Sequence, residues 1–426
     1  MAIDLAKGIS PARLAAFKIL QQVEGGGNSS VLLATEEPRL QAIDRALCHE
    51  LVLGSLRWQS WLDKIVEHFS KRRVESLDLP VRIALRLGLY QLRFLTRIPN
   101  AAAVNESVNL VRMARLSSAS AFVNAVLRRA VREPDYDPAA EGSDPLEKIA
   151  IETSHPIWLI ARWATSFGLD EARAFAHANN LVPPTAFRLV GNHSETLSKL
   201  TAAGAALESS HVADGAWRVS GTTSLLRELS AAGEIYLQDE ASQLVAQLLD
   251  AKPGERVLDL CAAPGGKTTM IADRTGDRAL IVAADRSGTR METVVATTKL
   301  HQLDGIKLVI LDATEQLPFW PESFDKVLVD APCSGTGTLR RNPEIRWRLG
   351  PADIPALADQ QKRILRNAIQ MVKPGGRLVY STCSVEREEN EEVVAESGLH
   401  PLETIRTWPH REGCDGFFIT ASKIHG

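Results

Sequence analysis

Cysteine is scarce in this chain of 426 residues, which has only five cysteines. The number is odd, and no two of them form a Cys-x-x-Cys pair. A disulfide framework usually has an even number of cysteines at regular spacing, and structural zinc usually needs closely paired ones. We therefore predict free thiols, a reducing cytoplasmic location and no metal.

Long apolar runs are also missing. No stretch approaches the ~18 residues of a membrane span, and the N-terminus has no basic-then-apolar secretory signal. Hydrophobic residues make up 45% of the chain and charged residues 24%, as in folded globular proteins. Because the chain is too long for one ordinary core, we predict several domains and no membrane partner.

Two nucleotide-binding fingerprints are incomplete. Gly266-Lys267-Thr268 matches the end of a phosphate loop, but Cys261 stands where its first glycine belongs. The dinucleotide pattern G-x-G-x-x-G is absent from the sequence. Residues 257–268, V-L-D-L-C-A-A-P-G-G-K-T, instead predict a strand, a glycine turn and a helix, which bind ligands through backbone N–H groups and the helix N-terminus. A turn led by Asp259 suits a cofactor with a cation and a ribose, such as S-adenosylmethionine.

The second half of the chain alternates strands and helices. Apolar runs predict buried parallel strands at 256–260, 279–284, 306–311, 325–329 and 377–381. This pattern is typical of a doubly wound sheet, whose ligands lie at the C-terminal strand ends. An aspartate follows each of four of these strands: Asp259, Asp285, Asp312 and Asp330. Asp285 comes 19 residues after Gly266, near the offset of ~20 at which an acid binds ribose hydroxyls, and Asp312 is placed to meet an adenine amino group.

Two cysteines fall at the same predicted sheet edge. Cys333 lies in D-A-P-C-S-G-T-G, which begins at Asp330, and Cys383 lies in Y-S-T-C-S. A thiolate beside a cofactor site is a candidate nucleophile, whereas Cys48 and Cys414 are expected to be inert buried groups. Methylation of a pyrimidine at carbon 5 needs such a thiolate at carbon 6, a supporting carboxyl group and a base. The residues alone do not rank the two thiols.

The first 133 residues predict a basic helical module. Helices are expected from Pro11, after a Ser10 cap, and at 44–54, 59–70, 78–95, 104–116 and 119–132. The module has 19 Lys and Arg against 12 Asp and Glu, although the whole chain has a formal net charge of −3. Arg82, Arg86 and Arg93 share one helix side, and Lys71-Arg72-Arg73 precede it. Their pattern fits either a phosphate-contacting surface or a solvated face.

Residues 134–147 are rich in Pro, Gly and acids and predict a linker. A small α+β domain is expected at 148–236, with strands at 185–190, 216–219 and 235–238 and helices at 194–204 and 222–231. His155 and its neighbouring tryptophans are expected to be packing groups.

Longer motifs carry a family resemblance. D-R-A-L-C-H-E-L-V-L-G-S-L-R-W from Asp44 and V-N-A-V-L-R-R from Val123 resemble the NusB-type RNA-binding domain. The stretches D-L-C-A-A-P-G-G-K-T, D-A-P-C-S-G-T-G-T-L-R-R-N-P-E-I-R-W and K-P-G-G-R-L-V-Y-S-T-C-S-V-E-R-E-E-N-E resemble the RNA 5-methylcytosine methyltransferases. With both parts, residues 10 to 421 resemble the bacterial Sun/Fmu type, which modifies a cytosine of 16S ribosomal RNA.

The resemblance implies three domains and a set of site residues. The domains are a NusB-like one at 1–133, an RRM- or ferredoxin-like one at 148–236 and a Rossmann-like methyltransferase domain at 237–426. Cys383 would be the nucleophile, Cys333 would assist product release, and Asp330 would contact the cytosine. The cofactor S-adenosylmethionine would be bound by Cys261, Ala262, Ala263, Pro264, Gly265, Gly266, Lys267, Thr268, Asp285, Arg290, Asp312 and Asp330. Arg340, Arg341 and Asn342 would face RNA, with Arg188 a weaker candidate.

The implied partner is 16S rRNA, naked or in a precursor particle, bound by a monomer that takes up a single-stranded or flipped-out cytosine. Three alternatives stay open. The same chemistry could act on transfer RNA, the near-match at Lys267 could belong to a phosphate-loop NTPase, or the chain could be a non-catalytic RNA-binding assembly factor. The last alternative leaves Cys333 and Cys383 without a role.

Overall fold

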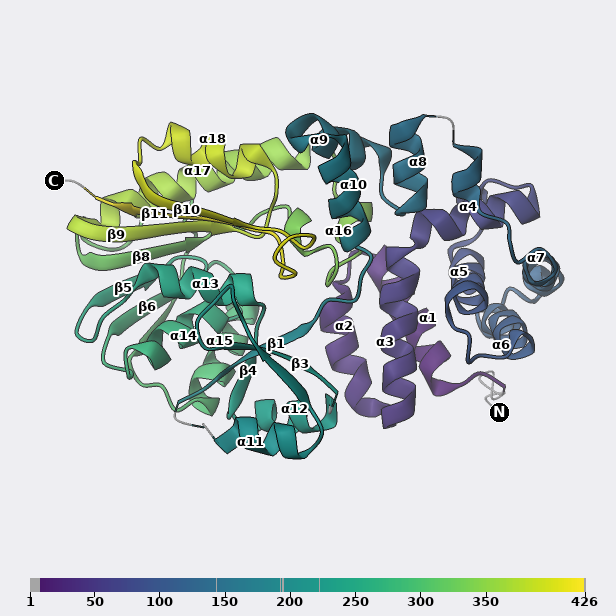
Figure 1. Cartoon of the computed structure of the whole chain (residues 1–426), viewed down its shortest axis with the longest axis horizontal. Coiled ribbons are helices and arrows are strands. Elements are labelled where there is room, and N and C mark those ends of the chain that lie inside the picture. Colours follow the sequence, from purple (N-terminus) through teal and green to yellow (C-terminus); the bar gives the residue numbers. More distant parts are fainter. Residues whose placement is uncertain (1–7, 143, 192, 194, 222, 425–426) are drawn as a thin grey trace. The chain divides into compact units, whose positions relative to one another are not determined.

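The computed structural model describes residues 8–142, 144–191, 193, 195–221 and 223–424. Its internal contacts form two compact units. The helical unit comprises the described residues up to Leu181 together with Leu339–Arg348, and the sheet unit comprises Val182–Thr338 together with the described residues from Leu349 onward. Figure 1 labels their elements. The helical unit extends beyond the predicted boundary at 133 because residues of the next helices bond to it: the Ser60 N–H donates to Ser154 Oγ at 3.1 Å.

The helical unit confirms the all-α prediction. Its α-helices are α1 (Pro11–Glu24), α2 (Ser29–Glu36), α3 (Ala42–Arg57), α4 (Gln59–Ser70), α5 (Leu79–Phe94), α6 (Asn100–Met113), α7 (Ser120–Arg132), α8 (Pro145–Glu152), α9 (Ile157–Phe167), α10 (Leu169–Ala178) and the short α16 (Ile345–Arg348). One continuous core includes Phe17, Leu51, Leu62 and Leu85. No helix within the described residues is long and apolar enough to cross a membrane.

Two details of the helical unit concern predicted polar residues. Ser10 precedes α1, but its side chain does not cap the helix; its N–H and Oγ donate to the Glu106 carboxylate at 2.7 and 2.8 Å instead. His155 is a packing group, as predicted: it is 2% exposed, and its ring lies 5.5 Å from that of the fully buried Trp163.

The segment Leu339–Arg348 is an unexpected part of the helical unit. The Glu344 carboxylate accepts hydrogen bonds from Ser29 N and Oγ at 2.9 and 2.8 Å. Trp347 Nε1 donates to Leu56 O at 2.6 Å. The fully buried Arg346 donates to Ser154 O at 3.1 Å. Buried polar groups are stable only with such partners, so this segment depends on residues far away in the sequence.

A small antiparallel sheet opens the sheet unit. Its strand order is β2-β3-β1-β4, with β1 at Thr185–Leu189, β2 at Ala206–Ser209, β3 at Ala216–Ser220 and β4 at Ile235–Leu237. The helices α11 (Glu195–Ala202) and α12 (Thr223–Ala231) contribute Leu200 and Leu226 to a core with Phe187 of β1. The predicted small α+β fold is confirmed, although β2 was not predicted; the helices within 148–181, which the predicted domain 148–236 included, belong to the helical unit. Residues 194 and 222, at the starts of two predicted helices, lie outside the described residues.

The larger sheet has seven strands in the order β10-β11-β9-β8-β5-β6-β7. The strands are β5 (Arg256–Asp259), β6 (Leu280–Asp285), β7 (Ile306–Ile310), β8 (Phe324–Asp330), β9 (Val372–Thr382), β10 (Pro401–Thr407) and β11 (Phe417–Lys423). The strands β5 to β9 pair in parallel, and β10 and β11 add an antiparallel edge. The five parallel strands are those predicted from the apolar runs, whereas β10 and β11 were not predicted.

Helices cover both faces of this sheet. Figure 1 shows α13 (Glu240–Leu249), α14 (Gly266–Arg274) and α15 (Gly288–Leu300) on one face and α17 (Asp353–Met371) and α18 (Glu391–Glu396) on the other. Successive residues of a strand pack on opposite faces of the sheet, since Val257 packs with α13 and α14 while Leu258 packs with α17. The doubly wound prediction is therefore confirmed.

Candidate active site

A cavity of about 280 Å³ opens at the C-terminal edge of the larger sheet. Its lining includes residues that follow β5 to β9, among them Cys261, Asp285, Asp312, Asp330, Cys333 and Cys383. Parallel strands bring their C-terminal ends to one edge. The fold thus collects side chains from more than 120 residues of sequence, including three of the four predicted strand-end acids.

The glycine turn forms one wall of this cavity. Gly265 has a φ of 105°, a backbone conformation that favours glycine, and a Cβ there would lie 3.2 Å from Val294 Cγ1. Ala263 and Pro264 line the cavity. The turn also lines a second cavity of about 180 Å³, to which Ala262, Gly266 and Lys267 contribute.

Two residues of the predicted cofactor motif, Asp259 and Thr268, are buried beneath the glycine turn. Thr268 is fully buried and donates from Oγ1 to Asp259 Oδ2 at 2.7 Å. Asp259 itself lines the second cavity and is 1% exposed. Burial raises the pKa of this carboxyl group to about 7. The two residues fix the end of β5 under the turn.

The two acids proposed for the cofactor lie on neighbouring strands, since β6 pairs with β7. Asp285 accepts hydrogen bonds from Ala263 N at 3.2 Å and Ser287 N at 2.9 Å. Arg290 Nη1 lies 3.5 Å from its carboxylate, and Arg290 Nη2 donates to Ala263 O. The Asp312 carboxylate accepts from Thr314 N and Oγ1, which lowers the pKa of Asp312. Both carboxylates are thus held in place at one cavity wall.

A buried ion pair links the glycine turn to β8. Lys267 Nζ lies 2.6 Å from Asp330 Oδ2, with the two side chains 13% and 26% exposed. Burial would lower the pKa of Lys267, but the Asp330 carboxylate outweighs that effect and raises it. Ser381 Oγ donates to Asp330 Oδ1 at 2.8 Å. Asp330 is therefore held in one orientation, with both carboxylate oxygens occupied by donors.

The two predicted thiols are adjacent. Cys333 Sγ and Cys383 Sγ lie 3.4 Å apart, within hydrogen-bonding distance for sulfur, and all five cysteines are free. The hydrogen bond with Cys383, together with burial, raises the pKa of Cys333 well above that of an ordinary thiol. Burial raises the pKa of Cys48 and of Cys414 to about 12, as expected for inert thiols.

Some site residues were missed in the sequence. Ser381 precedes Thr382 and Cys383 in a quoted motif, but no role was predicted for it. Glu389 lies in V-E-R-E-E-N-E and Gln361 lies in α17, and both form hydrogen bonds beneath the Cys333 loop. The only sequence signal was that Glu389 belongs to a long motif at the sheet edge.

The loop that carries Cys333 packs against another glycine. Gly337 N donates to Cys383 O at 2.9 Å, and Gly416 N donates to Gly337 O at 2.8 Å. A Cβ on Gly337 would lie 1.9 Å from Gly416 O.

We expect Gly337→Ala to lower the free energy of unfolding by about 3 kcal/mol, because the backbone must move. In the control Gly350→Ala, the new Cβ would lie 3.6 Å from its nearest neighbour; denaturant unfolding should show a change of about 0.5 kcal/mol or less. Equal losses in both variants would contradict this account.

The structure corrects one of the three α5 arginines that were candidates for phosphate contact. Arg86 is 5% exposed and bonds to Asp63 Oδ1 and Glu24 Oε1, each at 2.7 Å. It is therefore an internal ion-pair residue, and its prediction as a phosphate contact was wrong. Arg93 donates to the carbonyl oxygens of Glu133 and Pro134. Arg82 is half-buried, so its prediction stays untested.

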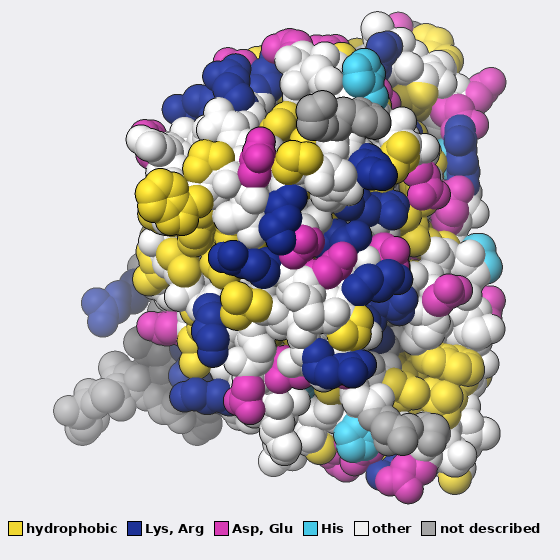
Figure 2. All heavy atoms as spheres, turned by 90° about the vertical axis from the view of Figure 1, so that its left-hand side faces the viewer, with side chains coloured by type: hydrophobic (Ala, Val, Ile, Leu, Met, Phe, Trp, Pro, Cys, Tyr) yellow, Lys and Arg dark blue, Asp and Glu magenta, His cyan; other side chains and the backbone are white. Residues whose placement is uncertain are grey.

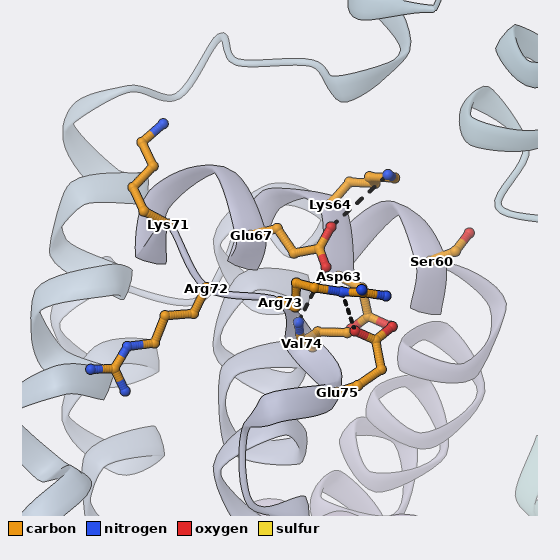
Figure 3. A pocket seen from close by; sticks show the side chains of 9 residues that line it. All are labelled: Ser60, Asp63, Lys64, Glu67, Lys71, Arg72, Arg73, Val74 and Glu75. Carbon is orange, nitrogen blue, oxygen red and sulfur yellow. Dashed lines mark hydrogen bonds and ion pairs between the residues drawn. The ribbon is translucent and has the colours of Figure 1, made fainter.

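The basic run Lys71-Arg72-Arg73 lines a cavity of about 540 Å³ formed by α4 and the segment that follows it (Figure 3). Acids share the lining: Arg73 Nε lies 3.5 Å from Glu75, and Lys64 Nζ lies 3.9 Å from Glu67. Figure 3 shows Lys71 and Arg72 directed away from these acids. The surface seen in Figure 2 likewise has Lys and Arg interspersed with Asp and Glu. These views show mixed charge.

The residues after the Cys333 loop also differ from the prediction. Arg340 is 3% exposed, and its carbonyl oxygen accepts from Arg57 Nη2 at 3.0 Å. Its prediction as an RNA-facing side chain is therefore wrong for this structure. Arg341 and Asn342 are half-buried, and Asn342 Oδ1 accepts from Ser30 Oγ at 3.0 Å.

Arg188 is also buried and bonded within the protein. It is 3% exposed, donates to Thr269 Oγ1 at 3.1 Å and lies 5.1 Å from the centre of the Tyr236 ring. Burial lowers the pKa of Arg188 to about 10. Arg188 connects β1 to the helix after the glycine turn, and its prediction as an RNA contact was wrong.

A doubly wound sheet with a glycine turn, strand-end acids and a thiol pair defines the Rossmann-like methyltransferase class. Three family models agree with this class along the chain. "16S rRNA methyltransferase RsmB/F" matches residues 246–400, "NusB family" matches 10–132, and the "RsmF/B-like, ferredoxin-like domain" matches 155–225. The chain belongs to the RsmB/F family of 16S rRNA methyltransferases.

Relatives match over nearly the whole length. The chain is 34% identical to "Probable ribosomal RNA small subunit methyltransferase B" of Bacillus subtilis, over 96% of each protein. It is 37% identical to "Ribosomal RNA small subunit methyltransferase B" of Pseudomonas putida, over 90% of this chain and 87% of that protein. Among solved structures, PH0851 is 27% identical with a TM-score of 0.84, covering 97% of this chain and 98% of that one. A methyltransferase homologue from Pyrococcus horikoshii is 26% identical with a TM-score of 0.58, covering 66% and 100%.

Proposed function

We propose that this protein transfers a methyl group from S-adenosylmethionine to carbon 5 of one cytosine in 16S rRNA, through a covalent cysteine–cytosine adduct. The observation that carries the proposal is the thiol pair at 3.4 Å in the cavity that Asp330, Asp285 and Asp312 also line. The small-subunit RNA substrate is taken from the names of relatives at 34–37% identity.

The residues present fit the cofactor. Asp285 and Asp312 are carboxylates on adjacent strand ends at one cavity, which suits a ribose diol and an adenine amino group. The glycine turn lets backbone approach the ligand closely. When bound, S-adenosylmethionine supplies an electrophilic methyl group on a sulfonium centre.

Cys383 is the nucleophile in this proposal. Its thiolate adds to carbon 6 of the cytosine, and the electron pair of the carbon 5–carbon 6 double bond makes carbon 5 able to accept a methyl group. Asp330 would contact the ring, with Lys267 and Ser381 fixing its orientation. The raised pKa of Cys333 leaves this thiol protonated at neutral pH, which supports its exclusion as the attacking group.

Product release reverses the addition. A base removes the proton from carbon 5, the carbon 5–carbon 6 double bond forms again, and the bond from Cys383 Sγ to carbon 6 breaks. The Cys333 thiol lies 3.4 Å from the departing sulfur. It can donate a hydrogen bond to the thiolate that leaves, which would stabilise the negative charge forming there.

The cofactor assignment predicts a binding defect. Asp285→Ala should weaken S-adenosylmethionine binding about 10- to 100-fold, since it removes charge-assisted hydrogen bonds of about 1.5–3 kcal/mol. Titration calorimetry with the purified protein measures this change. The exposed Asp304, in the loop before β7, offers the control Asp304→Ala, which should bind as the wild type does. Unchanged affinity in Asp285→Ala would remove Asp285 from the cofactor site.

The RNA substrate is tested with methyl-labelled S-adenosylmethionine and three RNAs: unmodified 16S rRNA, immature small subunits and unmodified transfer RNA. We expect label in one of the first two and none in transfer RNA. Label in transfer RNA alone would favour the first alternative. Binding of ATP in place of S-adenosylmethionine would favour an NTPase, and RNA binding without any transfer would favour an assembly factor.

A further inference from the structure

One motif residue is not used by the mechanism above. Glu389 lies at the end of the short 3-10 helix Arg387–Glu389 and is fully buried. Its carboxylate accepts hydrogen bonds from Ser334 N at 2.8 Å, Gln361 Nε2 at 2.9 Å, Ser334 Oγ and Ser384 Oγ. A buried carboxylate with this many donors is costly to disturb.

The donors come from both cysteine loops. Ser334 directly follows Cys333, and Ser384 directly follows Cys383. Gln361 also donates to Pro332 O at 2.8 Å, on the other side of Cys333. One carboxylate thus joins the backbone on either side of Cys333 to the residue after Cys383.

The charge of Glu389 also acts on one thiol. Its donors are a backbone N–H, two hydroxyl groups and an amide, all neutral, so the negative charge is stabilised by hydrogen bonds. The pKa of Cys333 is raised by the hydrogen bond with Cys383, by burial, by the charge on Cys383 and by the charge on Glu389. A nearby anion disfavours a thiolate.

Other ionisable groups near the pair do not replace Glu389. The pKa values of Tyr380 and Cys261 are raised, so both are neutral at neutral pH. Lys267 and Asp330 form an ion pair. The remaining charged groups that line the cavity are Asp285, Arg286, Arg290 and Asp312. Among these groups, Glu389 alone bonds to the residue next to each cysteine.

We propose that Glu389 is a positioning residue that holds the two cysteine loops together and places a negative charge where it disfavours a thiolate at Cys333. This inference rests on the proposed function for its role in methyl transfer. The hydrogen bond with Cys383 and burial raise the pKa of Cys333 more strongly, and the Glu389 charge adds to them.

Alkylation of the free protein tests the inference without RNA or cofactor. Wild type, Glu389→Gln and the exposed control Glu392→Gln are treated briefly with iodoacetamide between pH 7 and 11, and the initial rate at each cysteine is read by peptide mass spectrometry. In Glu389→Gln we expect the pH midpoint for Cys333 to fall by about one unit, which is about tenfold more thiolate below the midpoint. Glu389→Asp keeps the charge and should keep the high midpoint, as should Glu392→Gln.

Comparing the two thiols separates charge from structure. Loss of the Glu389 charge should speed alkylation of Cys333 more than that of Cys383, whereas loosened loops would speed both thiols by a similar factor; equal factors overturn the inference. If Glu389→Gln does not fold, the wild type still gives a test: Cys333 should be alkylated more slowly than Cys383 at pH 8, because a thiolate at Cys333 is disfavoured. Faster labelling of Cys333 would overturn the inference.

Activity gives the second readout. In Glu389→Gln, kcat should fall at least about tenfold with KM for RNA within twofold, because the residue acts on the thiols and not on RNA binding. A rise in KM alone would contradict the proposed role. If the wild type forms no 5-methylcytosine, the proposed function is wrong. If the Cys333 midpoint is unchanged in Glu389→Gln, only the inference about Glu389 is wrong.

Discussion

Replacing Cys383 with alanine is expected to reduce methyl transfer by at least about 10⁴-fold, because removal of a covalent nucleophile leaves only binding and electrostatic contributions. The variant should still bind S-adenosylmethionine, since Asp285 and Asp312 are unchanged. Single-turnover transfer of labelled methyl groups to unmodified small-subunit RNA measures the loss.

The matched variant Cys333→Ala should behave differently. If Cys333 assists release, this variant should accumulate RNA bound covalently to Cys383, seen as a labelled band that survives denaturing electrophoresis. Cys48→Ala, in a buried cysteine of α3, is the control and should keep wild-type turnover and form no stable adduct. Adduct formation by Cys383→Ala would show that the two thiols have the opposite roles.

Replacing Lys267 with methionine is the change with the second largest expected effect. It leaves Asp330 partly buried without its cation, and breaking such a pair costs about 3–5 kcal/mol. The free energy of unfolding should fall by about 3 kcal/mol, and methyl transfer should fall at least about 10²-fold because Asp330 is no longer held in place.

The chain offers a close control for this ion pair. Lys373 Nζ lies 2.6 Å from Asp325 Oδ1, the same distance as in the Lys267–Asp330 pair, but its side chain is 39% exposed against 13% for Lys267. Because exposed pairs contribute about 0–1 kcal/mol, Lys373→Met should change stability little and leave methyl transfer intact. Denaturant unfolding of both variants makes the comparison. Similar losses in both would contradict the burial argument.

The C-terminal edge of the larger sheet, with its candidate site residues, could be predicted because its signals are local. Each buried parallel strand is a continuous apolar run, and the acid or cysteine after it must fall at the same edge. From the sequence alone, this reasoning places Asp285, Asp312, Asp330, Cys333 and Cys383 together. The edge strands β10 and β11 were missed because they join the sheet as an antiparallel extension, outside the alternation of strand and helix that revealed the others.

The wrong predictions concern arginines whose hydrogen-bond and ion-pair partners lie far away in the sequence. Arg86 was grouped with Arg82 and Arg93 by helical periodicity, but Asp63 and Glu24 from other helices bury it in ion pairs. Arg340 follows the Cys333 motif, yet its segment folds into the helical unit through Glu344 and Ser29. Helical periodicity shows which side of a helix a residue occupies, and a motif shows its place in the chain. Whether a charged side chain is buried depends on acids and carbonyl groups elsewhere in the sequence, which neither pattern contains.

The chemical identity of the product tests the central claim most directly. Unmodified small-subunit RNA is incubated with the purified protein and methyl-labelled S-adenosylmethionine, digested to nucleosides and separated beside standards. The proposed reaction predicts that the label is in 5-methylcytidine and that one cytosine per RNA is modified. Label in N4-methylcytidine, in a methylated purine or on the ribose would contradict attack at carbon 6 and the role of the thiol pair.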